Sequence, residues 1–300
     1  MRKGGSILIV AGLLMTVLVY GVQRNAGAVS RTSPFSEQRA GADLKTLVGF
    51  GPRPAGSDAI VKARNYIVAE LQKAGLKPQL DEFDARTPRG FRHMVNIRAV
   101  RPGAKPTLIA ITGHYDTKAF DNIRFVGASD GGSSAAWLLE FARAAADLKL
   151  QNTLEFIFFD GEEAVVEWTD ADSVYGSRHD VDRRVRDKKL ADLKAMILVD
   201  MIGDKNLNIK KESQSTGWLK DVIWNTAQSL GYVKEFPKNQ IDVEDDHIPY
   251  LKANIPSVDL IDFDYPCWHM ACDTLDQVSA HSLKIVGDVV YASLPEIDRR

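Results

Sequence analysis

From residue 36 onward, apolar runs of strand length alternate with longer segments of helical periodicity. The strand-length runs are residues 94–100, 107–112, 153–159, 195–201 and 257–261. The helical patterns include residues 58–73, 133–148, 217–230 and 279–294. Strands that alternate with helices form βαβ units, in which neighbouring strands run parallel. The alternation therefore predicts an α/β domain with a substantially parallel sheet.

The body of the chain contains no internal repeat and no Gly/Ser-rich linker that would divide it. We therefore expect a single α/β domain over residues 36–300, a size that one such domain can reach. Within it, residues 180–189 (DVDRRVRDKK) are rich in charge and predict a solvated helical face.

The overall composition excludes several classes of protein. With 45% hydrophobic and 26% charged residues, the chain is neither disordered nor collagen-like. Its 38 basic and 40 acidic residues leave no net positive charge to displace phosphate counterions, so we expect no nucleic-acid partner. The two cysteines, Cys267 and Cys272, are too few to staple a domain of this size, which must be held by its core.

The first 28 residues have the pattern of a targeting segment. Arg2 and Lys3 precede an unbroken apolar run at 7–22, and residues 26–28 (AGA) have the small-x-small form of a cleavage site. The run is rather short for a membrane span, which needs about 20 apolar residues. Residues 1–28 are therefore a cleaved signal peptide or a retained signal-anchor, and both remain open. Residues 29–35 form a linker that ends at the helix N-cap Ser36.

Either form of the segment places the body across a membrane from the ribosome. We expect an exported protein that is periplasmic or secreted, or anchored by the N-terminal segment, which would be its only contact with the membrane.

Polar residues gather where the predicted strands end. His114 and Asp116 follow one strand, residues 160–163 (DGEE) follow the next, Asp200 closes a third, and His269 comes shortly after the last. In parallel sheets, ligands bind beyond the carboxyl ends of the strands. These residues therefore predict the position of a site.

Asp130, Glu163 and His269 form a carboxylate, carboxylate and imidazole set, which is the ligand set of a catalytic zinc site with an open fourth position. Glu162, next to Glu163, would remain free to move protons. Taken singly, each residue has a simpler interpretation. Asp130 can be a helix N-cap, the glutamates can be solvated charges on a turn, and a lone histidine is more often structural.

Cys267 and Cys272 flank His269 and raise a rival metal site of Cys/His type, although they lack the paired CxxC spacing of structural zinc sites. A local disulfide and two reduced, buried thiols are equally compatible with the sequence.

Several motifs follow one another in a fixed order. They are residues 113–118 (GHYDTK), 127–130 (GASD), 158–164 (FFDGEEA), 199–203 (VDMIG) and 268–269 (WH). Together they resemble the zinc aminopeptidase superfamily M28. Three stretches carry a narrower resemblance to its glutaminyl cyclase branch, the glutaminyl-peptide cyclotransferases: residues 162–179, residues 245–250 (DDHIPY), and Trp268-His269 followed by Asp273-Thr274. Residues 51–53 (GPR) with Gly56-Ser57 are similar to the family's N-terminal motif.

The resemblance implies a role for each matching residue. One zinc ion per chain would be held by Asp130, Glu163 and His269, and Glu162 would be the proton-carrying acid/base. Asp200 and Asp245 would assist it through a buried hydrogen-bond chain, and Trp168 and Trp268 would line the pocket. The implied fold is a twisted, mainly parallel but mixed sheet of about six strands flanked by helices, the architecture of zinc aminopeptidases.

The implied activity is that of an acyltransferase. It would convert the N-terminal glutamine of peptides or proteins to pyroglutamate with release of ammonia, in a single catalytic domain that we expect to be a monomer. The sequence departs from the animal enzymes at Glu244, where they have glutamine, and at Tyr265-Pro266, which lies one residue nearer Trp268. Both changes concern the pocket wall more than the reaction.

The alternative is an M28-type aminopeptidase with two metal ions. His114 and Asp200 could complete a second site bridged by Asp130. In the cyclase branch the same two residues serve in hydrogen bonds, so their presence does not discriminate. The tryptophans and residues 245–247 (DDH) favour the cyclase. A non-catalytic binding protein on this fold would have lost some of these groups, and none is lost.

Overall fold

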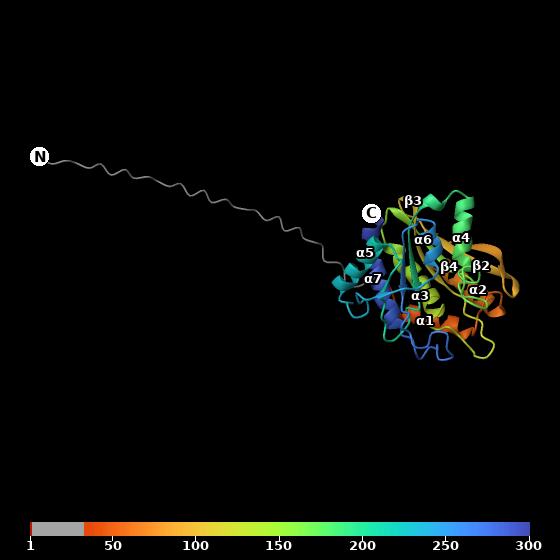
Figure 1. Cartoon of the computed structure of the whole chain (residues 1–300). Helices are drawn as coiled ribbons and strands as arrows, with labels where there is room; N and C mark the ends of the chain where they lie inside the picture. Colours follow the sequence, from red (N-terminus) through yellow and green to blue (C-terminus); the bar gives the residue numbers. More distant parts are fainter. Residues whose placement is uncertain (2–32) are drawn as a thin grey trace.

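The computed structural model describes residues 33–300 together with Met1 (Figure 1). The predicted targeting segment beyond Met1 and the linker up to residue 32 lie outside the described residues. Within residues 33–300, no helix combines the length and the hydropathy that a membrane span requires.

A six-stranded sheet in the order β1-β2-β4-β3-β5-β8 forms the centre of the domain. Its strands are β1 (Gln79–Thr87), β2 (Gly90–Arg101), β3 (Lys105–His114), β4 (Asn152–Phe159), β5 (Leu193–Asp200) and β8 (Ser257–Ile261). Strands β4, β3, β5 and β8 run parallel, whereas β1 and β2 join at one edge in antiparallel pairing. The prediction of a mainly parallel, mixed sheet of about six strands is confirmed.

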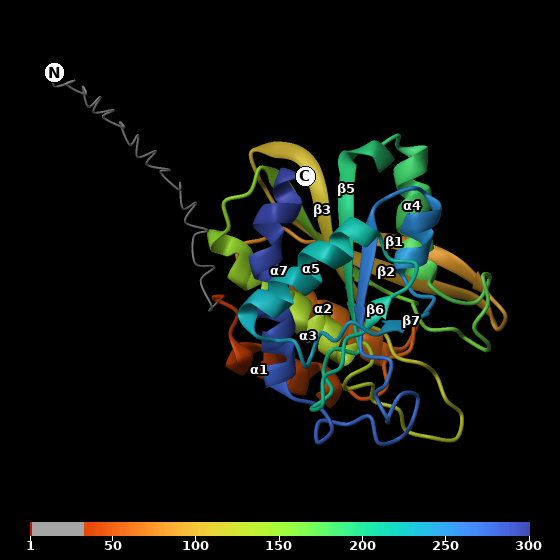
Figure 2. The same ribbon diagram turned by 60° about the vertical axis from the view of Figure 1, so that its left-hand side comes forward.

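Helices cover both faces of this sheet (Figure 2). The larger layer consists of α1 (Glu37–Gly49), α2 (Asp58–Lys73), α3 (Gly132–Ala144), α5 (Gly217–Leu230) and α7 (Ala280–Arg299). The smaller layer consists of α4 (Tyr175–Arg186) and the short α6 (His247–Lys252). The two short strands β6 (Lys211–Glu212) and β7 (Gln240–Ile241) form a separate parallel pair.

Side chains of the central strands alternate between two hydrophobic cores. In β4, Phe156 and Phe158 face the larger helical layer, while Ile157 and Phe159 face α4 and α6. Strand β5 repeats this alternation with Ile197 in the larger core and Leu198 in the smaller one. Because both faces are covered, these strands are apolar at nearly every position, and for this reason they could be recognised in the sequence.

Strand β1, one of the two edge strands, was not predicted because it contains no continuous apolar run. Its exposed residues alternate with partly or fully buried ones, and most of its residues are polar. Backbone hydrogen bonds to β2, in the register Phe83↔Met94, hold β1 in the sheet. Such bonds leave no apolar pattern in the sequence. Helices α2 and α5 have the predicted bounds.

The prediction of a solvated face at residues 180–189 is wrong for three side chains, Val181 and the charged Asp180 and Arg184. Asp180 and Arg184 are almost completely buried. The Arg184 guanidinium donates to Asp180 Oδ2 at 2.6 Å and to Glu155 Oε2 at 2.5 Å, and the Tyr250 hydroxyl donates to the same Asp180 oxygen at 2.6 Å. This network ties α4 to β4 and to α6, and so holds the segment that begins at Asp245.

We expect Arg184→Ala to lower the free energy of unfolding by about 3–5 kcal/mol, because it leaves Glu155 and Asp180 as buried charges that have lost a partner. Urea denaturation of purified protein measures this change. The exposed Arg186 of the same helix supplies the control, since Arg186→Ala should alter stability by no more than about 0.5 kcal/mol. Equal effects of the two substitutions would contradict a stabilising role for the network.

Candidate active site

The carboxyl ends of the parallel strands meet at one edge of the sheet, where the long connecting loops gather (Figure 2). His114 is the last residue of β3 and Asp200 the last residue of β5. Glu162 and Glu163 follow β4, and His269 lies in the loop after β8. The structure therefore brings together the polar residues that the strand ends predicted.

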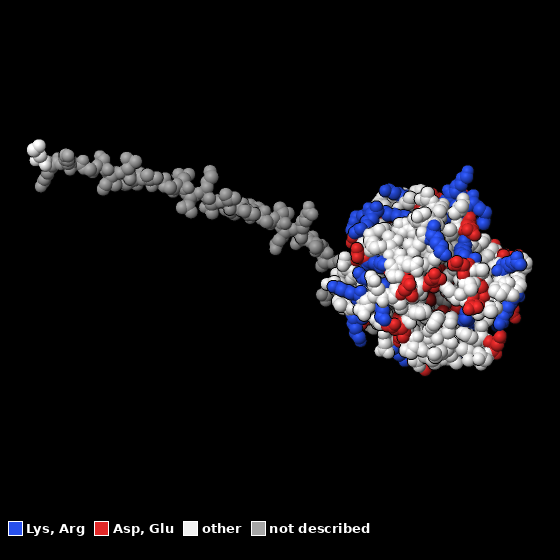
Figure 3. Space-filling view, in the orientation of Figure 1, with Lys and Arg blue, Asp and Glu red and all other residues white. Residues whose placement is uncertain are grey.

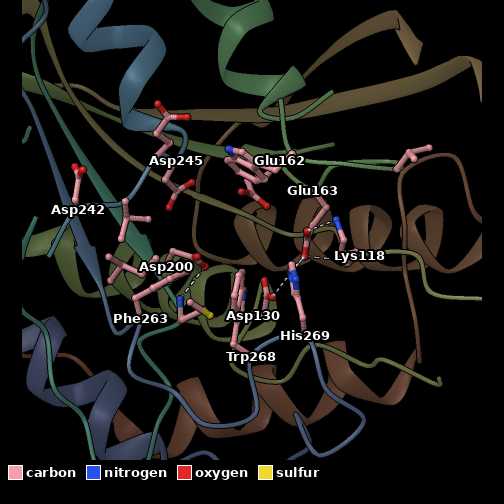
Figure 4. Close-up of a pocket in the computed structure, with 16 residues that line it drawn as sticks. Lys118, Asp130, Glu162, Glu163, Asp200, Asp242, Asp245, Phe263, Trp268 and His269 are labelled. Atoms are coloured by element: carbon pink, nitrogen blue, oxygen red, sulfur yellow. Dashed lines mark hydrogen bonds and ion pairs between the residues drawn. The ribbon is translucent and has the colours of Figure 1, made fainter. Parts of the chain in front are cut away.

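Asp130, Glu163 and His269 converge on one point, with ligand atoms that all lie within 4.8 Å of one another (Figure 4). The His269 Nε2 atom lies 3.4 Å from Asp130 Oδ2 and 3.3 Å from Glu163 Oε1. Asp130 Oδ2 is buried and receives no hydrogen bond from any residue in the described part of the chain. A buried, unpartnered carboxylate oxygen beside a second carboxylate and an imidazole fits a divalent metal ion, and this donor set is one that zinc prefers.

Asp130 is positioned by Asp273, four residues after His269. The backbone amides of Ser129 and Asp130 donate to the two Asp273 oxygens at 2.8 and 3.1 Å. The Tyr265 hydroxyl donates to Asp273 Oδ1 at 2.7 Å. Sequence reasoning noted Asp273 only as part of a motif and assigned it no role, because the loop that it holds lies far away in the chain.

Arg53 was likewise noted only as part of a motif, and the structure shows what it contacts. Its fully buried guanidinium donates to the carbonyl oxygens of Tyr115, Val126 and Gly127 at 2.9, 2.6 and 2.9 Å. Burial lowers its pKa to about 10, so it remains a cation at neutral pH. Arg53 therefore fastens the loop after β3 to the loop before α3 and places a positive charge behind the carboxylates.

The turn that carries Glu162 and Glu163 is held by Asp116. The amides of Glu162 and Glu163 donate to Asp116 Oδ1 and Oδ2 at 3.2 and 3.4 Å. Gly161 in this turn has a φ of +69°, a conformation that favours glycine, and a Cβ there would overlap the side chain of Met94. Glu163 accepts from the Lys118 amide at 3.1 Å, whereas Glu162 Oε2 lies 3.7 Å from His114 Nδ1. The two neighbouring glutamates thus serve different parts of the site.

Glu162 is buried, and burial raises its pKa well above the usual range for a glutamate. The imidazole of His114 opposes this, while the carboxylates of Glu163, Asp245 and Asp246 raise the pKa further. Burial and the neighbouring Asp200 also raise the pKa of Asp245 well above its usual range. A raised pKa makes a carboxyl group better suited to proton transfer, because it accepts a proton more readily than an ordinary carboxylate.

Four carboxylates surround His114, with Asp116 and Glu162 near Nδ1 and Asp130 and Asp200 near Nε2. Its Nε2 atom is 3.0 Å from Asp200 Oδ1 and 3.3 Å from Asp130 Oδ1. Asp200 Oδ1 also accepts from the Ser134 hydroxyl at 3.2 Å and from the Met201 amide at 2.7 Å. The ligand atoms of His114, Asp130 and Asp200 lie within 4.8 Å of one another, so they too could hold a metal ion.

A cavity of about 450 Å³ opens beside these residues. Glu162, Asp200 and Asp245 line it together with Trp168 and Trp268, which are 37% and 40% exposed. Glu244, the departure noted in the sequence, lines it as well. In the space-filling view, acidic side chains gather around a hollow on the face shown (Figure 3). The cavity has a polar floor and an aromatic wall, as a site for a small amide-bearing group requires.

Asp245 is held by the start of α6. His247, two residues later, places Nε2 3.1 Å from Glu212 Oε2 on β6, and both side chains are fully buried. Asp245 Oδ1 accepts from the Asp246 amide at 2.5 Å, whereas Asp245 Oδ2 receives no hydrogen bond from residues 33–300. The unpartnered oxygen belongs to a side chain that lines the cavity.

Cys267 and Cys272 form a disulfide. The structure therefore decides between the two states that the sequence left open. A bridged cysteine has no thiolate to offer a metal, so the rival Cys/His site is excluded.

Comparison with known proteins gives concordant results. The model of peptidase family M28 matches residues 96–294. A glutaminyl-peptide cyclotransferase-like protein of Mus musculus is 32% identical over 80% of this chain and 71% of its own length. The glutaminyl-peptide cyclotransferase of Drosophila melanogaster is 28% identical over 78% of this chain and 75% of its own.

Solved structures extend the similarity to the fold. A glutaminyl cyclase from an Acidobacteriales bacterium superposes with a TM-score of 0.84 at 36% identity, covering 90% of this chain and 98% of that one. A zinc-dependent exopeptidase from Parabacteroides distasonis superposes with a TM-score of 0.78 at 27% identity, covering 90% and 100%. The chain belongs to peptidase family M28 and, within it, to the glutaminyl-peptide cyclotransferases.

Proposed function

We propose that this protein is a zinc-dependent glutaminyl-peptide cyclotransferase. It converts the N-terminal glutamine of peptides or proteins to pyroglutamate and releases ammonia, an intramolecular acyl transfer. The observation that carries the proposal is the buried Glu162 next to the convergent Asp130, Glu163 and His269 on the floor of a tryptophan-lined cavity. Membership of the cyclotransferase group supports it.

Asp130, Glu163 and His269 would hold one zinc ion per chain. When bound there, zinc supplies a Lewis acid that polarises the γ-carbonyl of the substrate glutamine and stabilises the negative charge that develops on its oxygen. The reacting amine and carbonyl belong to the same residue, so the pocket needs only to select the folded conformer of the substrate.

Glu162 carries the proton. The α-amine nitrogen forms a bond to the side-chain carbonyl carbon, and the bond from that carbon to the amide nitrogen breaks. Glu162 takes a proton from the attacking amine and delivers it to the leaving nitrogen, which departs as ammonia. Its buried position and raised pKa suit a group that must both accept and donate a proton.

Asp200 and Asp245 assist this transfer through hydrogen bonds. Asp200 is fixed by His114, Ser134 and the Met201 amide, so its carboxylate is oriented before substrate arrives. Asp200 lines the cavity and would accept a hydrogen bond from the substrate amine as it attacks, with the buried Asp245 beside it. Trp168 and Trp268 cover the flat amide of the substrate and exclude the water that would compete with the amine as nucleophile.

A second candidate activity is that of an aminopeptidase with two metal ions. The observation in its favour is the second group of potential ligands, His114, Asp130 and Asp200. Both activities share the first three ligands, so the reaction products and the metal stoichiometry must discriminate between them.

We also propose that the protein is exported, either periplasmic or secreted, or anchored at the membrane by residues 1–28. The apolar run with its cleavage-site pattern supports this proposal, and so does the disulfide, since such bonds persist mainly in oxidising compartments. Residues 29–35 would act as a linker, and residues 36–300 as a single, monomeric catalytic domain.

Incubation of the purified protein with a peptide that begins with glutamine should release ammonia and leave the chain uncleaved. Mass spectrometry detects the expected loss of ammonia, and metal analysis should find close to one zinc per chain. An otherwise identical peptide that begins with asparagine is the matched substrate control. Cleavage of amino-acid amides together with two zinc ions per chain would favour the aminopeptidase.

Glu162→Gln should retain zinc, because the three ligands remain, but lose activity by about 10²–10⁴-fold, because the amide cannot carry the proton. Steady-state kinetics and metal analysis of the same preparation measure both properties. Glu167→Gln changes an exposed glutamate of the same segment and should leave both unchanged. Full activity in Glu162→Gln would refute the role assigned to this residue.

A further inference from the structure

The disulfide closes a small ring around a proposed zinc ligand. Cys267 and Cys272 are the only cysteines of the chain, and their bridge encloses Trp268, His269, Met270 and Ala271. The ring lies in the connection between β8 and α7, and residues 262–279 of this connection contain neither a helix nor a strand. His269 therefore takes its position from local contacts and from the bridge, not from regular secondary structure.

His269 has an unusual backbone conformation. Its φ of +53° falls in the left-handed region, which non-glycine residues seldom adopt unless the surrounding structure holds them there. The Met270 amide donates to the Cys267 carbonyl at 3.0 Å and closes a turn over this residue. The rings of Phe120 and Phe125 pack edge-on against the imidazole, with centroids 5.6 and 5.8 Å away. The bridge adds a covalent constraint across the same turn.

The ends of the ring contact other parts of the active site. Trp268, which lines the cavity, stacks on His269 with a centroid distance of 4.4 Å. Asp273 follows Cys272 directly and accepts hydrogen bonds from the Ser129 and Asp130 amides. Loss of the ring conformation would therefore disturb two of the three proposed zinc ligands, His269 directly and Asp130 through Asp273.

The bridge is accessible from solvent on one side, since Cys272 is exposed whereas Cys267 is buried. We propose that the Cys267–Cys272 disulfide is a positioning device that holds His269 ready for zinc, so that reduction of the bridge weakens zinc binding. This inference rests on the proposed function only in taking zinc as the ligand of His269. Second-layer groups that orient a metal ligand typically affect metal affinity by about 10–100-fold.

The test compares the zinc affinity of the full-length protein with the bridge intact, with the bridge reduced, and in the double variant Cys267→Ala/Cys272→Ala. Tris(2-carboxyethyl)phosphine is a suitable reductant because it contains no thiol that would bind zinc. It breaks the S–S bond, leaves two thiols, and is oxidised to the phosphine oxide with an oxygen atom from water. Competition with a chromophoric chelator gives the dissociation constant of zinc.

We expect the dissociation constant to rise roughly 10- to 100-fold on reduction and by a similar factor in the double variant. The phosphine should have no further effect on the double variant, which serves as the matched control for direct effects of the reductant. Reduction of folded wild-type protein provides the second measurement if the variant folds poorly. An unchanged dissociation constant in the reduced protein would overturn the proposal.

A purely structural role would give a different result. The melting temperature of the zinc-free protein would then fall on reduction, while the zinc dissociation constant of the folded protein would stay the same, and this outcome also overturns the proposal. Activity of the oxidised wild type towards a glutamine-initiated peptide is measured separately. An inactive protein whose zinc affinity still depends on the bridge would contradict the proposed function and support the inference.

Discussion

The burial of many carboxylates at one edge of the sheet is the constraint on which the rest of this structure depends. Asp116, Asp130, Glu162, Glu163 and Asp245 are all buried there. Taking a carboxylate out of water costs several kcal/mol unless a proton, a cation or hydrogen bonds compensate. The structure supplies some of this compensation through Arg53, His114 and Lys118 and through raised pKa values. The point between Asp130, Glu163 and His269 suits a metal cation, which would supply more.

Hydrogen bonds behind the site fix the conformation of the loops at this edge of the sheet. Asp116 holds the turn of the two glutamates, Asp273 holds the loop of Asp130, and Arg53 joins that loop to the end of β3. All three side chains are buried and bond mainly to backbone groups of segments distant in sequence. The loops that carry the proposed zinc ligands therefore depend on the folded core for their conformation, as preorganised sites generally do.

The same proposed metal ligands can support a cyclase or a peptidase. The two activities differ in what they require of the residues that line the cavity above these ligands. A peptidase must admit a water nucleophile, whereas a cyclase must keep water away while the substrate folds on itself. Trp168 and Trp268 lie on the wall, and Trp268 belongs to the ring closed by the disulfide. One short loop thus carries a proposed zinc ligand and part of the pocket wall.

The sequence by itself determined the central strands, most of the helices, and the residue types that the site requires. Buried strands and amphipathic helices leave local periodic patterns, and motifs such as residues 158–164 leave a local signature of the site. Only the tertiary structure decided the edge strand β1, the burial of Asp180 and Arg184, the anchoring roles of Arg53 and Asp273, and the oxidation state of the cysteines. These features depend on partners far away in the chain or on the distance between two side chains, and local periodicity carries no information about either.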